Sequence, residues 1–109
     1  MIVKQSTVTR IEITEAPRLD PIRVYIENYE PGKGRITISC YDAAWVGYWG
    51  GMSGDTIEAF FCRCHAEYLS GNLLSPSGLR QGKNHTAYLI RIIEAVQQAL
   101  REQAKGGAA

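Results

Sequence analysis

The segment Cys62-Arg63-Cys64-His65 holds two of the three cysteines and one of the two histidines. These residue types can bind zinc or form a nucleophile and base pair. In a helix, residues two apart point about 200° away from each other, so Cys62 and Cys64 cannot easily share one ion. Glu58, Cys62 and His65 would share a helix flank, but structural zinc sites use four ligands. Cys62 and His65 also lack an orienting third group for catalysis.

The segment 50–56, Gly-Gly-Met-Ser-Gly-Asp-Thr, precedes a predicted helix, and a glycine-rich entry to a helix can bind phosphate. It lacks the Lys-Ser/Thr ending of a P-loop, and Asp55 would place a carboxylate where the phosphate should lie. We therefore interpret the segment as a corner between a strand and a helix. Because the chain also shows no paired carboxylates, we predict a protein without cofactor or metal that is not an enzyme.

Cations and aromatic rings form a third candidate group. Its members are Arg18, Arg23, Lys33, Arg35, Arg80, Lys83 and His85 with Tyr25, Tyr41, Trp45 and Trp49. Bases that stack on a sheet beside cations are one mode of nucleic-acid binding. The formal net charge is only +1, and carboxylates are interspersed among the cations, unlike a polyphosphate-binding surface. A protein interface, where Tyr, Trp and Arg are enriched, is our first interpretation and nucleic-acid binding the alternative.

Alternation of apolar and polar residues predicts four strands, in the segments 7–15, 22–29, 35–41 and 43–49. The turn Glu-Pro-Gly-Lys-Gly at 30–34 joins the second and third into a hairpin. In the fourth segment Trp45 and Trp49 lie on one face and Tyr48 on the other. Since both faces carry large residues, we expect one face under a helix and the other under a loop or a partner.

Two helices are predicted after the strands. Asp55 and Glu58 have the spacing of a capping box, and the apolar residues after them recur on one helix face until Gly71 ends the helix. Asn84 caps the last helix, whose apolar stripe is Leu89, Ile92, Ile93, Val96 and Leu100. The segment 71–83 between them is predicted to be a long loop, and loops of this length are often functional.

Strands grouped before helices predict an α+β fold, a four-stranded antiparallel sheet of meander type followed by two helices on one face. The length of 109 residues predicts a single domain, 1–109, with 1–6 and 104–109 frayed. No apolar run reaches about 18 residues, so we expect no membrane span. The three cysteines do not resemble a disulfide framework, which favours a cytoplasmic protein with reduced thiols.

Several segments resemble a family of small proteins encoded by tailed bacteriophages and prophages of Gram-negative bacteria. They are residues 18–24, 32–38, Trp45, Tyr48-Trp49-Gly50-Gly51-Met52, Phe60-Phe61 and Tyr68-Leu69. The similarity spans roughly residues 10–74 and excludes the last helix. The family has no established activity, so no binding or catalytic residue carries over. The resemblance implies a phage accessory protein in the bacterial cytoplasm, and such proteins often bind and disable a host machine.

We therefore predict a non-enzymatic protein-binding module that inhibits a host defence complex, in the manner of an anti-CRISPR protein, by steric or allosteric blocking. The predicted contact residues are Arg35, Trp45, Tyr48, Trp49, Leu79, Arg80 and Lys83. The pattern does not decide whether the aromatic residues of the fourth strand belong to the core or to an interface. An edge strand such as the first would also allow a homodimer about a two-fold axis.

Overall fold

The computed structural model describes residues 1–73 and 83–107. It contains strands β1 (Thr9–Ile13), β2 (Ile22–Glu30), β3 (Lys33–Cys40) and β4 (Ala43–Trp49), and helices α1 (Ile57–Arg63), α2 (Ala66–Asn72) and α3 (Lys83–Gly107). The predicted α+β class is confirmed. The described residues form three helices rather than the predicted two, because the first predicted helix is divided.

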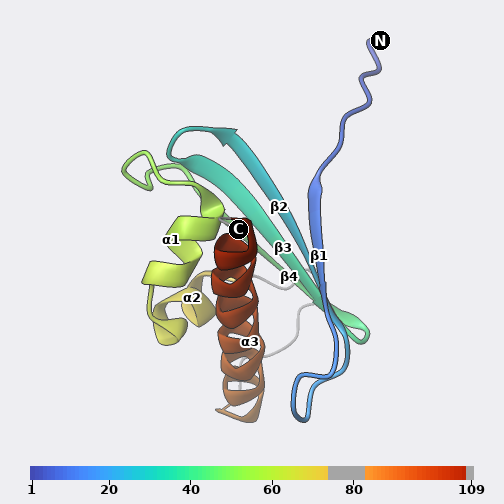
Figure 1. The fold of residues 1–109 in the computed structure, drawn as a ribbon, viewed down its shortest axis with the longest axis vertical. Coiled ribbons are helices and arrows are strands. Elements are labelled where there is room, and N and C mark those ends of the chain that lie inside the picture. The colour runs from blue at the N-terminus through green and yellow to red at the C-terminus, as the bar shows by residue number, and fades with distance from the viewer. Residues whose placement is uncertain (74–82, 108–109) are drawn as a thin grey trace.

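The sheet has the order β1-β2-β3-β4, and each strand runs antiparallel to the next, as predicted for a meander (Figure 1). The β2–β3 hairpin turns at Gly32, whose φ of 84° suits glycine. Register fixes which residues share a face: Val24 lies opposite Ile38, and Ile38 lies opposite Trp45. One face of the sheet therefore carries an unbroken apolar layer.

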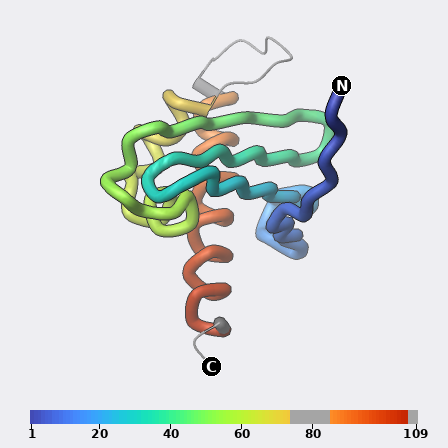
Figure 2. Tube along the Cα trace, turned by 90° about the horizontal axis from the view of Figure 1, so that it is seen from above, coloured from blue at the N-terminus to red at the C-terminus, as the bar shows by residue number. Residues whose placement is uncertain are grey.

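The core lies between this apolar layer and the helices, and α3 crosses the strands at a steep angle (Figure 2). From the sheet it takes Ile22, Val24, Ile26, Ile36, Ile38, Cys40, Trp45 and Trp49; from the rest of the chain it takes Met52, Ile57, Phe60, Phe61, Leu69, Leu73, Leu89, Ile92, Ile93, Val96 and Leu100. The predicted stripe of the last helix is thus confirmed as core.

The first predicted helix is interrupted at Cys64, whose backbone is extended (φ −87°, ψ 151°). The interruption has a tertiary cause. Gln97 of α3 is 7% exposed, and its Nε2 donates to the carbonyl oxygens of Phe61 (3.0 Å) and Cys64 (2.8 Å). In an uninterrupted helix, these carbonyl oxygens would accept hydrogen bonds from backbone N–H groups one turn later. Here they accept hydrogen bonds from the Gln97 side chain instead.

Two terminal expectations also need correction. Gly71 does not end a helix, because α2 continues to Asn72 and Leu73 is the C-cap. The last helix continues to Gly107, so residues 104–107 are helical where fraying was expected. Of the predicted loop 71–83, the part 74–82 lies outside the described residues. None of the described helices is both long and apolar enough to cross a membrane.

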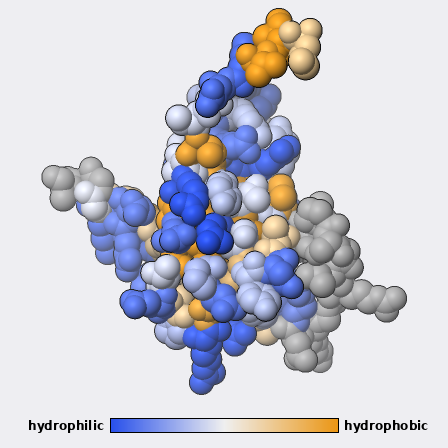
Figure 3. Space-filling view, turned by 90° about the vertical axis from the view of Figure 1, so that its right-hand side faces the viewer, coloured by the Kyte–Doolittle hydropathy of each residue, from blue (hydrophilic) through white to orange (hydrophobic). Residues whose placement is uncertain are grey.

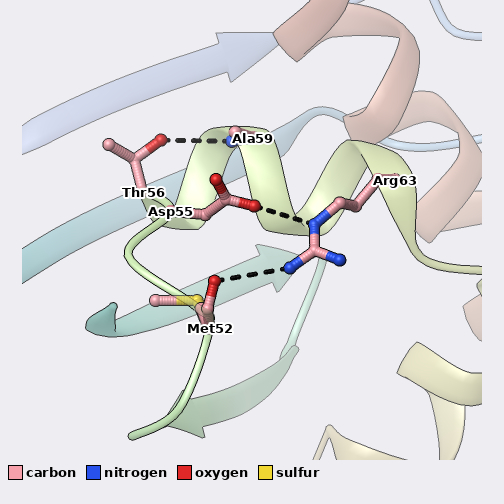
Figure 4. A network of polar contacts seen from close by, with 5 residues as sticks. All are labelled: Met52, Asp55, Thr56, Ala59 and Arg63. Atoms are coloured by element: carbon pink, nitrogen blue, oxygen red, sulfur yellow. Dashed lines mark hydrogen bonds and ion pairs between the residues drawn. The ribbon is translucent and has the colours of Figure 1, made fainter. Parts of the chain in front are cut away.

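The corner, residues 50–56, joins β4 to α1 through hydrogen bonds within the chain. Met52 N donates to Gly32 O (3.0 Å), and Gly32 N donates to Asp55 O (3.1 Å), which ties the corner to the β2–β3 turn. Arg63 reaches back from α1: its Nε lies 2.8 Å from Asp55 Oδ2 and its NH2 donates to Met52 O at 3.4 Å (Figure 4). The cap of α1 is Thr56 and not Asp55 as predicted, because the helix begins at Ile57. Asp55 pairs with Arg63 instead.

Replacing Thr56 by alanine is expected to lower the free energy of unfolding by about 1 kcal/mol. The Thr56 hydroxyl accepts a hydrogen bond from Ala59 N at 3.2 Å (Figure 4), which satisfies one of the free N–H groups at the helix start. Urea denaturation followed by circular dichroism measures the loss. Thr56→Ser keeps the acceptor oxygen and should retain most of the stability; equal losses in both variants would show that the cap contributes nothing.

Candidate interaction surface: the open face of the sheet

The face of the sheet opposite the core is not covered by any described helix, and we call it the open face. Its residues are Arg10 and Glu12 of β1, Arg23, Tyr25, Glu27 and Tyr29 of β2, Arg35, Thr37 and Ser39 of β3, and Ala44, Val46 and Tyr48 of β4. All of them are exposed or partly exposed. The alternation of the strands positions them, because successive side chains point to opposite faces.

Two tyrosines form the most exposed aromatic group on the open face. Tyr29 is 51% exposed and Tyr48 is 55% exposed, and their ring centroids are 6.4 Å apart. Tyr29 continues the alternation of Arg23, Tyr25 and Glu27, and a bulge between Asn28 and Glu30 leaves it without a partner residue in β3. Arg35 lies directly opposite Tyr48 in the register and opposite Glu27 on its other side. This end of the open face therefore combines two phenol rings with a guanidinium group and a carboxylate.

The other end of the open face is held by ion pairs. Glu12 Oε2 lies 3.1 Å from Arg10 Nη2 and 3.3 Å from Arg23 Nε. The neighbouring Tyr25 side chain, followed by the charge of Glu12, raises the pKa of Arg10 above its ordinary value. Because these groups are close to half exposed, the pairs are screened by water and fix side-chain positions more than they stabilise the fold.

Two of the predicted contact residues, Trp45 and Trp49, lie in the core. The prediction that they lie on the surface is wrong. Trp45 is fully buried and Trp49 is 8% exposed. Trp45 packs near the rings of His85 (5.9 Å) and Tyr88 (6.3 Å). The register is the reason, because the two-residue turn after Cys40 places Trp45 opposite the buried Ile38.

Trp49 is the second buried tryptophan. Its ring packs near those of Phe60 (5.3 Å) and Phe61 (6.5 Å), and its Nε1 donates to the Tyr68 hydroxyl at 3.3 Å. Trp49 therefore packs α1 and α2 against the sheet, and little of its own side chain is exposed for contact with a partner.

The remaining predicted contact residues divide into two groups. Tyr48 and Arg35 lie together on the open face. Leu79 and Arg80 lie outside the described residues, and Lys83 begins α3 with its side chain outside them. Tyr29 was not predicted as a contact residue from the sequence. The alternation of β2 could have indicated it, because Tyr29 follows Arg23, Tyr25 and Glu27 at every second position.

Two of the three cysteines, Cys62 and Cys64, lie in surroundings that favour the neutral thiol. Burial is the main cause that raises the pKa of both Cys62 and Cys64, and a thiol with a raised pKa is a poor nucleophile. The Cys62 thiol donates to the carbonyl of Gln97 at 3.7 Å, and Cys40 is buried, with its thiol donating to the carbonyl of Asp20 at 3.5 Å. Among the described residues, no three His, Cys, Asp or Glu side chains group as metal ligands.

Comparison with known proteins shows which family the chain resembles. The model of a phage family, Phage_phiTE_072, matches residues 1–86, which contain the whole sheet and helices α1 and α2. No curated protein matches the chain, and no solved structure matches it. The predicted phage origin is confirmed. Because the match covers well over half of the sequence, the chain belongs to this phage family.

Proposed function

We propose that this phage protein is a non-enzymatic module that binds a host protein on the open face of its sheet. The observation that carries the proposal is the mixed composition of that face. It presents tyrosines, arginines and glutamates side by side, and no described helix covers it. Tyrosine and arginine are enriched at protein interfaces, where they supply large contact area together with directed hydrogen bonds.

The centre of binding would be the group of Tyr29, Tyr48 and Arg35. The two rings offer apolar surface that is already exposed, and Arg35 offers a fork of donors beside them. Residues of this kind dominate binding energy when a partner removes water from them. The strands fix their backbone positions, so little ordering is needed when a partner binds.

The charge of the open face favours a protein over nucleic acid. Arg10, Arg23 and Arg35 are accompanied by Glu12 and Glu27, and Glu12 already pairs with two of the arginines. A phosphate backbone would gain from the arginines but would be repelled by the glutamates. A protein surface with charges of both signs can match this pattern.

Within this function, the specific form that we propose is inhibition of a host defence complex of the anti-CRISPR type in the host cytoplasm. Its support is the phage family and the balanced charge, +1 over the chain. A mimic of DNA would need a dense carboxylate surface. The inhibitor would therefore act by covering or locking a surface of its target.

Nucleic-acid binding is the second candidate function, and one arrangement favours it. Tyr25 lies directly opposite Arg10, and Tyr48 lies directly opposite Arg35, so two rings on an open sheet each have a cation beside them. Bases stack on such rings in sequence-tolerant binding. Affinity for nucleic acid would then fall steeply with added salt.

The proposal is tested by capture from host lysate with tagged protein, with and without nuclease. We expect the unmodified protein and Tyr41→Ala to retain one stoichiometric protein partner after nuclease treatment, and the double variant Tyr48→Ala, Arg35→Glu to lose it. Tyr41 is a matched control because it is 77% exposed but lies beyond the end of β3. Capture that disappears with nuclease would support the second candidate, and equal capture by the double variant would refute the open face.

A further inference from the structure

The N-terminal arm, residues 1–8, forms neither strand nor helix and extends away from the body of the protein (Figures 1 and 3). Its tip is apolar and bare: Met1, Ile2 and Val3 are each at least 80% exposed, and Val8 is 48% exposed. Contiguous exposed apolar residues of this size mark interaction sites. The arm therefore has the composition of a strand that packs against something.

The arm cannot easily pair with the β1 strand that it precedes. It enters β1 directly, and the segment from Lys4 to Thr9 contains no Gly, Pro, Asn or Asp and, of the residues common in tight turns, only Ser6. Eight extended residues reach about 26 Å. The tip therefore lies well beyond its own strand, where it is available to another molecule.

A groove runs between the outer edge of β1 and α3. It consists of three adjoining hollows of about 420, 360 and 500 Å³. Its apolar lining includes Ile11, Ile13, Ala95, Ala99 and Leu100, and its charged residues are Glu12, Glu15, Glu58, Glu94 and Glu102 with Arg10 and Arg91. The groove thus offers an apolar floor with an excess of negative charge along its sides.

The edge of the sheet beside this groove has free backbone groups. Within residues 1–73 and 83–107, β1 is the last strand of the sheet and pairs with β2 alone, so the N–H and C=O groups on its outer side have no partner strand in this part of the chain. Such an edge is a template for an added strand. An occupant of the groove that is itself an extended chain could pair with β1 and place alternate side chains against α3.

We propose that two copies of the chain exchange arms, each arm adding antiparallel to the outer edge of the other copy's β1. Charge favours this occupant over an acidic one, because the arm carries no carboxylate side chain and one cation, Lys4, whereas the groove holds five glutamates against two arginines. The exchange is reciprocal, as a two-fold symmetric interface requires.

One register sets Val3 and Lys4 of the arm beside an apolar and an acidic residue of the second copy. It places Lys4 opposite Glu12 and Val3 opposite Ile13 of the second copy, with the two Val8 residues facing each other on the two-fold axis. Directly opposite residues share a face in an antiparallel pair. Val3 therefore joins Ile13, which already packs against the core, on the side of α3, and Lys4 lies on the open face beside Glu12.

Arm exchange would join two four-stranded sheets into one continuous sheet with both open faces on the same side. The inference rests on the arm, the groove and the edge of β1, so it stands or fails separately from the function proposed for the open face.

The oligomeric state tests the exchange, measured by size-exclusion chromatography with light scattering. We expect the unmodified chain to be a dimer and Val3→Asp to be a monomer, because the new carboxylate would enter an apolar and acidic groove. Tyr41→Asp adds the same charge in the turn between β3 and β4, two strands that do not adjoin β1, and should remain dimeric. A monomeric unmodified chain, or a dimeric Val3→Asp variant, would overturn the proposal.

Cross-linking tests the register in the intact chain and does not depend on loss of a contact. Val8→Cys should form a disulfide between copies on mild oxidation, because opposite residues have Cβ atoms within about 5.5 Å. Ser6→Cys is the matched control: it is on the same face but roughly four residues, about 13 Å, from its counterpart in the other copy. Covalent dimer from Ser6→Cys as readily as from Val8→Cys, on a non-reducing gel, would contradict this pairing.

Discussion

Replacing Trp45 by alanine is expected to lower the free energy of unfolding by about 3–5 kcal/mol. The side chain is fully buried and packs between the sheet and the beginning of α3, near the rings of His85 and Tyr88. Its removal loses apolar burial and leaves a cavity that rigid strands cannot close. Urea denaturation followed by circular dichroism gives the difference.

Two further variants separate burial from other effects of Trp45. Tyr48→Ala on the opposite face of β4 should change stability by no more than about 0.5 kcal/mol. Trp45→Phe should cost less than alanine, because it keeps a ring and removes an indole N–H that has no hydrogen-bond partner in the described structure. A loss below about 1 kcal/mol for Trp45→Ala would contradict its place in the core.

Replacing Gly34 by alanine is expected to destabilise the protein by about 1–3 kcal/mol. A Cβ at Gly34 would lie 2.5 Å from Ile57 Cγ1 and 2.7 Å from the carbonyl oxygen of Glu27. The first residue of α1 rests directly on β3 at this point, so the helix or the β2–β3 pairing must move. Gly34 is required for close packing here and not for an unusual backbone angle.

Gly51 offers a matched control for this prediction. It lies in the corner, has no positive φ, and a Cβ there would meet nothing within 4 Å. Gly51→Ala should therefore be neutral or slightly stabilising, since alanine restricts the unfolded chain. Equal thermal midpoints for the two alanine variants would show that α1 does not sit as closely on β3 as the structure has it.

The sequence predicted the strands well because their alternation and turn residues are local signals. It separated Trp45 and Trp49 from Tyr48 correctly, but it did not tell which set faces the helices, since large residues occupy both sides. The sequence did not give the register between β3 and β4. A two-residue turn at 41–42 pairs Cys40 with Ala43, and this pairing places Trp45 on the same face as the apolar residues of β2 and β3.

The division of the first helix could not be read from local sequence. No glycine or proline marks Cys64 or His65, and the apolar spacing continues across them. The cause is Gln97, which lies more than thirty positions away and binds the carbonyls at the end of α1. A similar limit applies to the candidate site: alternation places Tyr29 and Tyr48 each on a face of its strand, but only the pairing of β2 and β4 with β3 brings the two rings together.

The affinity of Tyr48→Ala for the captured host partner, measured by titration calorimetry beside Tyr41→Ala, tests the central claim most directly. If the open face is the binding surface, Tyr48→Ala binds at least about tenfold more weakly, which is 1.4 kcal/mol, and Tyr41→Ala binds like the unmodified chain. Equal affinities for the two variants would contradict the claim and place the interaction elsewhere on the protein.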